Sequence, residues 1–293
     1  MREMPLVKPQ PVQEQEPMTH LRRGSLDYVI EPLLALNALL AYSFLYLPIA
    51  VLVLFSFSAS RYASIWGGFS LEWYAKLLHN PDIVRALLNS LLIAAATALI
   101  ATVLGTMAAV GLARLADRRR AARYDAALTL PILLPDIVQG ISLLLFFVVV
   151  FNGLERMLDW RPTLGRTTVI IAHAAFAISY VAVVVRARLS GMDKRLQEAA
   201  MDLGANEWQV FQHITLPLIW PGVLSGGLLA FTLSLDEFVI TFFTSGPGAT
   251  TLPIQVWSMV KRGVTPEINA LSTLMLLASV ALVTLAIILQ RRR

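Results

Sequence analysis

The sequence predicts an all-α membrane protein with six transmembrane helices. Hydrophobic residues make up 57% of the 293 residues and charged residues only 15%, whereas soluble domains carry about 25% charged residues. Six apolar runs each approach or exceed the roughly 20 residues that a helix needs to cross a bilayer. One long polar segment, Asp193–Pro217, separates the fourth run from the fifth. Because cysteine is absent, disulfides give no clue to the compartment.

The N-terminal segment 1–30 begins MREMPLVKPQPVQEQEP and is rich in proline, glutamine and glutamate. So little apolar surface cannot form a core, so we expect a disordered tail. No short apolar run in it ends at a small-residue cleavage site, and we therefore do not interpret it as a signal peptide.

The six predicted spans are 34–57, 87–113, 127–151, 167–189, 218–244 and 269–290. An even number of spans leaves both termini on the same side. Most of the 24 basic residues lie in the tail, after the second run, around the polar segment and at residues 291–293. The positive-inside rule therefore predicts that both termini and the polar segment are cytoplasmic. Because the basic residues cluster at the ends of apolar runs, we interpret the net charge of +5 as a topology signal and not as a nucleic-acid surface.

Two outer loops and two spans carry irregular features. The loop 58–86 is predicted to contain a short amphipathic helix on the outer surface, because helical spacing relates Leu71, Tyr74, Leu77 and Leu78. The loop after the fifth run opens with the turn sequence SGPG.

The third span contains Pro131 and Pro135, and the fifth begins LPLIWPGVLSGG. Such residues loosen helical hydrogen bonding, either at a functional break or at ordinary kinks in packed helices.

The polar segment is predicted to form two short helices parallel to the membrane. The first has one apolar stripe, formed by Leu196, Ala199, Ala200 and Leu203. Asp193 stands where an N-cap would lie, and Gly204 where a glycine would end the helix. Asn206 and Gln209 form a loose capping pair for the second helix, which Pro217 closes. Composition alone favours a surface helical hairpin that merely links two spans.

The sequence EAAMDLGANEWQVFQHITLP resembles the EAA loop of binding-protein-dependent ABC importer permeases. That pattern is Glu-Ala-Ala, three residues, glycine, nine residues and Ile-x-Leu-Pro. The residues that match it, or that lie within it as Asp202 does, are Glu198, Ala199, Ala200, Asp202, Gly204, Ile214, Leu216 and Pro217. The resemblance implies that this short helix docks on a cytoplasmic ATPase. It also implies that the chain hydrolyses nothing itself and transmits its partner's motion.

We expect neither enzymatic activity nor a cofactor or bound metal. The phosphate-loop pattern G-x-x-x-x-G-K-[ST] does not occur in the sequence. The four histidines, His20, His79, His173 and His213, lack metal-ligand spacing. His173 lies inside an apolar run, and we interpret it as a packed or pore-lining residue.

Three carboxylates lie within predicted spans, where each costs about 2.5–3.5 kcal/mol. Asp136 is about ten residues into the third span, so about 15 Å deep and near the midplane. Asp236 and Glu237 lie about 26 Å from the cytoplasmic side, toward the outer mouth. On a continuous helix Ser234, Glu237, Thr241 and Thr244 share one face, and Thr232 and Asp236 an adjacent one. These acids favour a path for cations. Alternatively, Asp136 caps a helix that restarts after Pro135, and Asp236 pairs with a base of another subunit.

Three longer segments, LPDIVQGISLLLFF, FTLSLDEFVITFFTSGP and LPIQVWSMVKRGVTPEINALST, resemble the second-type permease subunit of spermidine/putrescine importers. The resemblance covers about residues 35–290. It implies that Asp136, Asp236 and Glu237 serve polyamine passage. It further implies a bacterial inner-membrane complex with two copies of an ATPase, a second permease and a periplasmic or surface solute-binding protein.

On this basis the chain divides into a cytoplasmic tail (1–30), a first transmembrane helix with its outer loop (31–85) and a permease domain (86–290). Two alternatives remain open at this point. The same machine would carry another small organic solute or a ferric ion. A secondary transporter or channel driven by an ion gradient would need no ATPase, but it leaves the EAA pattern unexplained.

Overall fold

The computed structural model describes residues 27–63, 65–115, 117–193, 195–263 and 265–291. The predicted disordered tail therefore lies almost wholly outside the described residues. The chain divides into two units, Met1–Val51 and Leu52–Arg293.

The described part of the first unit is helical and belongs to α1 (Asp27–Phe55), whose last turn reaches into the second unit. Its segment Ile30–Phe55 is 26 residues long and apolar enough to cross a membrane. Large apolar side chains such as Phe44, which is 85% exposed, cover its surface. A helix that is apolar all round is typical of a membrane span, so the predicted first span is confirmed.

The rest of the chain is also helical, as predicted. Its elements are α2 (Glu72–His79), α3 (Pro81–Ala113), α4 (Arg118–Leu133), α5 (Asp136–Leu158), α6 (Arg166–Ser190), α7 (Arg195–Asp202), α8 (Glu207–Val210), the π-helical turn η1 (Phe211–Thr215), α9 (Leu216–Asp236), α10 (Val239–Thr244), α11 (Leu252–Arg262) and α12 (Pro266–Arg291). Among the described residues, five helical stretches have the length and hydropathy of a membrane span. The sixth predicted span corresponds to α12, in which Pro266–Ala281 forms a shorter apolar helix.

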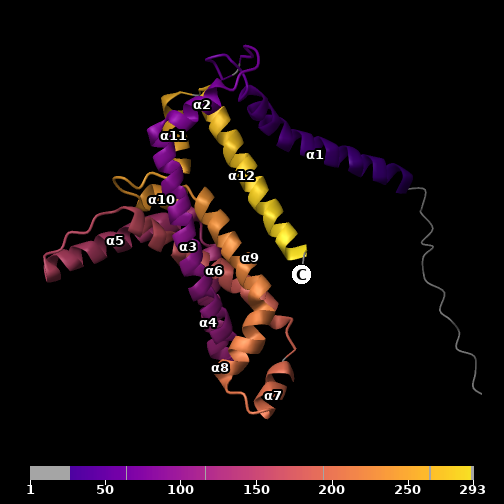
Figure 1. The fold of residues 1–293 in the computed structure, drawn as a ribbon, viewed down its shortest axis with the longest axis vertical. Coiled ribbons are helices and arrows are strands. Elements are labelled where there is room, and N and C mark those ends of the chain that lie inside the picture. The colour runs from indigo at the N-terminus through magenta and orange to yellow at the C-terminus, as the bar shows by residue number, and fades with distance from the viewer. Residues whose placement is uncertain (1–26, 64, 116, 194, 264, 292–293) are drawn as a thin grey trace, which may run out of the picture. The chain divides into compact units, whose positions relative to one another are not determined.

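Three long helices, α3, α6 and α9, pack side by side and hold the main core of this unit (Figure 1). Val181 of α6 is fully buried between a glycine of α3 and a glycine of α9. A Cβ on Gly105 would lie 2.7 Å from Val181 Cβ, and one on Gly226 would lie 3.2 Å from Val181 Cγ1. Small residues let helices approach closely in membranes, where packing drives association.

We expect Gly105→Ala to destabilise this core. The new methyl group would also lie 2.9 Å from the Ile178 carbonyl oxygen, which is backbone and cannot turn aside. Overpacking of this kind costs about 1–3 kcal/mol, so the thermal unfolding midpoint in detergent should fall. Gly111→Ala in the same helix is the matched control, because nothing lies within 4 Å of its Cβ position. Equal midpoints for the two variants would contradict the close contact.

The predicted third span is wrong as a single helix. The chain breaks at Leu134 and Pro135, which are both extended, so that α4 ends and α5 begins within the predicted run. Pro135 has no N–H to donate to the carbonyl of Pro131 four residues earlier. Gln139 replaces that donor, since its Nε2 lies 2.9 Å from the Pro131 oxygen and 3.1 Å from the Leu134 oxygen. Pro131 itself stays inside α4.

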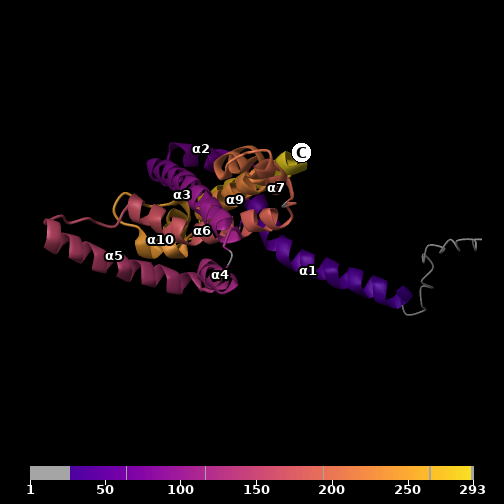
Figure 2. The same cartoon turned by 90° about the horizontal axis from the view of Figure 1, so that it is seen from below.

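The predicted fifth span is also interrupted. Helix α9 ends at Asp236, and α10 begins at Val239 after Glu237 adopts an extended conformation. Helix α10 then packs against α5 (Figure 2). The two breaks therefore lie on elements that contact each other.

The predicted amphipathic helix of the outer loop is present as α2, and Leu77 and Tyr74 pack inward as predicted, but the buried face is shifted toward Trp73. Trp73 and Leu77 are buried, whereas Leu71 and Leu78 are 56% and 73% exposed. Trp73 takes the buried position because its Nε1 donates to the Ser58 carbonyl at 2.8 Å and its ring packs in the cluster that α2 forms with α3, α11 and α12.

Candidate functional site

The polar segment begins with α7, which has no buried residue. Asp193 precedes it, and its carboxylate accepts the Arg195 N–H at 3.0 Å. At the other end Gly204 has φ +87°, its N–H donates to Met201 and the Ala205 N–H donates to Ala200. These two bonds are the Schellman arrangement that ends helices at glycine. The predicted first helix and its glycine terminus are confirmed.

The second predicted helix is not a separate element. The predicted capping pair is present, since Gln209 Oε1 accepts the Asn206 N–H at 2.8 Å and Asn206 Oδ1 accepts the Gln209 N–H at 2.9 Å. Beyond it, however, α8 continues through η1 into α9 without a break. The Leu216 N–H bonds to Phe211, five residues back. This wider turn precedes Pro217 directly, and such π turns accommodate irregularities within helices.

Two side-chain contacts hold the segment, one to the end of α3 and one within the segment itself. Arg114, which follows α3, pairs with Glu207 of α8 at 3.1 Å. Gln197 of α7 donates to Thr215 of η1 at 3.0 Å. Neither pair follows from local sequence periodicity, and sequence reasoning missed both.

An open pocket of about 400 Å³ lies where α7 turns into α8 and η1. Its lining includes Ala200, Gly204 and Ile214, three residues of the EAA pattern. The apolar side chain of Leu203 also borders it and is 90% exposed. We call this surface, α7 with Leu203 to Ile214, the coupling surface, after the docking role that its resemblance to an EAA loop implies.

The predicted acids lie at the two helix breaks. Asp136 is the first residue of α5, and Glu237 lies between α9 and α10. One helical turn after each, α5 and α10 touch: a Cβ on Gly140 would lie 3.4 Å from the Ile240 Cα. Two residues 101 positions apart are thus brought together.

The three acids differ in their surroundings. Glu237 Oε1 accepts the Ile240 N–H at 2.8 Å and so caps α10. Asp236 is exposed and lines two pockets, of about 400 and 540 Å³. No ion pair within the described part of the chain involves Asp136, Asp236 or Glu237.

The family of the chain follows from comparisons with known proteins. The model of the family described as "binding-protein-dependent transport system inner membrane component" matches residues 101–292. The chain belongs to this family. The putrescine transport system permease protein PotI of Escherichia coli K12 is 46% identical over 253 residues, which cover 86% of this chain and 89% of PotI. The spermidine/putrescine transport system permease protein PotC of Haemophilus influenzae is 42% identical over 251 residues, 86% of this chain and 93% of PotC.

Solved structures show the same fold. A chain of a bacterial ABC transporter involved in the import of the acidic polysaccharide alginate superposes with a TM-score of 0.77 at 18% identity, over 91% of this chain and 96% of that one. The same kind of transporter in complex with an alginate pentasaccharide-bound periplasmic protein gives 0.74 at 18% identity, over 91% and 95%. The chain is therefore the permease subunit of an ABC importer, and its relatives are named as permeases and not as enzymes.

In this permease a buried histidine joins the helices around the second break. His173 of α6 is fully buried, which agrees with the packed role expected for it. Its Nδ1 lies 2.7 Å from Ser234 Oγ and its Nε2 lies 2.8 Å from Thr241 Oγ1. Thr241 donates its own hydrogen to the Glu237 carbonyl at 2.9 Å. Thr241 must then accept from Nε2–H, and Nδ1 accepts from Ser234.

Ser234, Thr241 and Thr244 share a side, as predicted, despite the break, and all three are buried against α6. Sequence reasoning noted His173 and did not connect it with Glu237, because nothing local relates residues on different helices.

We expect His173→Leu to destabilise the permease and to slow uptake, because it leaves the buried Ser234 hydroxyl without its partner and removes the bond from His173 to Thr241. The cost of such groups is about 1–3 kcal/mol. The thermal unfolding midpoint and the uptake rate of the reconstituted complex would report it. His173→Gln keeps a donor and an acceptor and should recover part of both. A leucine variant that matches the wild type in both measurements would show that the hydrogen bonds of His173 to Ser234 and Thr241 are dispensable.

Proposed function

We propose that this permease passes polyamines, putrescine or spermidine, across the bacterial inner membrane as part of an ATP-driven importer. The observation that carries the proposal is the 46% and 42% identity to permeases named for putrescine and spermidine/putrescine transport, over 86% of the chain. The geometry supports it, because three carboxylates without ion-pair partners among the described residues suit a cargo of two or three ammonium groups.

In this proposal Asp136, Asp236 and Glu237 line the cargo path. Carboxylates at both helix breaks replace part of the water that an ammonium group loses in the membrane. Breaks in membrane helices are tolerated where they line such a cavity. The division into a tail (1–30), a first helix with its outer loop (31–85) and a permease domain (86–290) is part of this proposal.

The coupling surface receives the driving force. We propose that two copies of a cytoplasmic ATPase hydrolyse ATP, and that one of them docks at this surface through Glu198, Ala199, Ala200, Asp202 and Gly204. A second permease completes the path. The pair Arg114–Glu207, 3.1 Å apart, would pass motion of α8 to α3. This arrangement places both termini in the cytoplasm, so a solute-binding protein delivers cargo to the opposite side.

The test uses the whole complex, purified from its native membranes through an affinity tag on this chain. An ATPase, a second permease and a binding protein should co-purify or be encoded beside it. After reconstitution, the spermidine-loaded binding protein should stimulate ATP hydrolysis and spermidine uptake. Stimulation by a ferric ion or by a neutral organic solute, with none by polyamines, would show that the cargo is that ion or solute and not a polyamine. A complex without an ATPase would contradict the coupling mechanism.

A further inference from the structure

Four aromatic rings form a continuous row at the second helix break. Phe238 lies in the break, with its ring centroid 5.5 Å from Trp257 of α11 and 5.8 Å from Phe242 of α10. Phe242 is in turn 5.5 Å from Phe243. We call Trp257, Phe238, Phe242 and Phe243 the aromatic row. Trp257 and Phe242 are 42% and 52% exposed, so the row is accessible at both of these rings.

The aromatic row connects the acidic positions. At one end Phe238 and Trp257 line a pocket of about 400 Å³ together with Asp236, the only charged residue among its described lining. At the other end Phe243 packs on α5, since a Cβ on Gly140 would lie 2.6 Å from Phe243 Cδ2. Gly140 is one turn from Asp136. The row thus runs from the Asp236 pocket to the helix that begins with Asp136.

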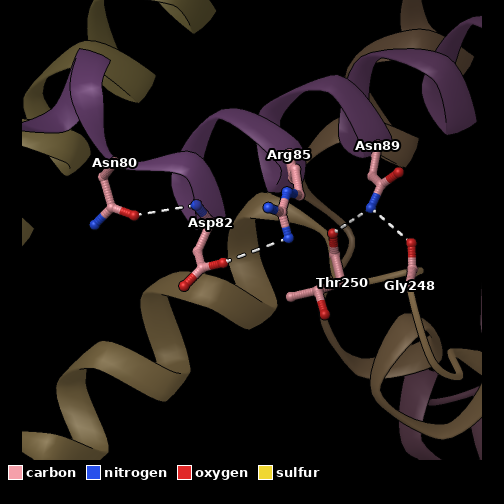
Figure 3. Close-up of polar contacts among 6 residues, drawn as sticks. All are labelled: Asn80, Asp82, Arg85, Asn89, Gly248 and Thr250. Atoms are coloured by element: carbon pink, nitrogen blue, oxygen red, sulfur yellow. Dashed lines mark hydrogen bonds and ion pairs between the residues drawn. The ribbon is translucent and has the colours of Figure 1, made fainter.

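Hydrogen bonds from α3 fix the outer part of this arrangement. Figure 3 shows Asn89 donating to the carbonyls of Gly248 and Thr250, at 3.0 Å each. The next residue, Ser90, accepts the Leu252 N–H at 2.8 Å. These bonds hold the loop that leads into α11 and the first residue of the helix that carries Trp257.

The chemistry of the pocket fits an alkylammonium chain. The carboxylate of Asp236 binds an ammonium group, and aromatic faces attract cations while offering apolar surface to methylene groups. The structure already contains such a contact: the Lys261 Nζ lies 5.1 Å from the Trp257 ring centroid. A lysine side chain is itself a primary alkylammonium, so this ring accepts the same group that ends a polyamine.

We propose that Asp236 and the aromatic row form a binding site for alkylammonium cargo, with Trp257 and Phe238 as its cation–π partners. The assignment rests on the proposed polyamine function and deepens it. Alternating ammonium and methylene groups would then contact alternating carboxylates and rings along the path. A neutral solute of the same length would gain only the apolar contacts.

The test is the binding of radiolabelled spermidine to the purified permease–ATPase complex without its binding protein. A cation–π contact contributes about 0.5–2 kcal/mol, so Trp257→Leu should raise the Kd roughly 2- to 30-fold. Replacing Trp257 by tryptophans with one to four ring fluorines leaves its size almost unchanged and weakens the negative ring face. The Kd should rise progressively with the number of fluorines.

Trp160→Leu is the control, because Trp160 is 59% exposed and lies outside the aromatic row; its Kd should equal that of the wild type. Three results would overturn the assignment. They are a wild-type complex that binds no spermidine, a Trp257→Leu variant with unchanged Kd, and a Kd that does not change with the number of ring fluorines. Any of them can occur in a complex whose ATPase is still stimulated by the spermidine-loaded binding protein. Failure of the site is thus distinguishable from failure of the proposed function.

Discussion

Gly204→Val is expected to reduce ATP-coupled uptake by about tenfold or more, while the chain still inserts in the membrane. Gly204 has φ +87°, a conformation that costs non-glycine residues about 1–2 kcal/mol and β-branched residues more. No atom lies within 4 Å of its Cβ position, so the effect would come from the backbone and not from a collision. The strain would reopen the Schellman turn and redirect α7 away from its docking position.

The measurements are spermidine uptake and ATP hydrolysis by the reconstituted complex. Gly204→Asn is the matched control, because asparagine tolerates the left-handed conformation better than other residues and should retain most uptake. Glu198→Lys tests the same surface without backbone strain. Its side chain is exposed, so reversal of the charge should uncouple hydrolysis from uptake and leave the fold intact. Normal uptake by both Gly204→Val and Glu198→Lys would refute the coupling role.

Removing the charge of Glu237 should reduce spermidine uptake roughly tenfold, because a hydrogen bond to a charged group contributes about 1.5–3 kcal/mol. Glu237→Gln is chosen because the amide oxygen can still accept the Ile240 N–H, so the cap of α10 survives. Asp136→Asn should produce a loss of similar size. The double variant should lose more than either single variant if both carboxylates meet the cargo.

Uptake at subsaturating spermidine measures this loss, and the thermal unfolding midpoint checks that the fold is kept. Glu155→Gln is the control, since Glu155 pairs with Arg161 at 2.7 Å and lies outside the proposed path. A drop of equal size in Glu155→Gln and Glu237→Gln would indicate a general electrostatic effect. Unchanged uptake in the double variant would exclude these acids from the cargo path.

The features that the sequence predicted correctly are local ones. Apolar runs of sufficient length located the spans, and the glycine after an amphipathic stripe located the end of α7. The pair Asn206 and Gln209 gave the start of α8, because capping depends on residues three positions apart.

The features that escaped prediction depend on partners distant in sequence or on compensation for a proline. Gln139 satisfies the carbonyl that Pro135 frees, and this stabilises a full break where a kink was an equally good expectation. The approach of Asp136 to Glu237 requires α5 to pack on α10, and the two hydrogen bonds of His173 require α6 to pack on both α9 and α10. No periodicity in the sequence encodes such contacts.

Because α8, η1 and α9 follow one another without a break, Glu207–Asp236 forms one continuous helix of 30 residues. At about 1.5 Å per residue it is about 45 Å long. One end carries Glu207 and borders the coupling surface, and the other end is Asp236 at the cargo pocket. In the proposed coupling mechanism, a displacement at the docking end would reach Asp236 through continuous helical backbone, without crossing a loop. Gly204 lies just before this continuous helix, and the extended residue Glu237 lies just after it.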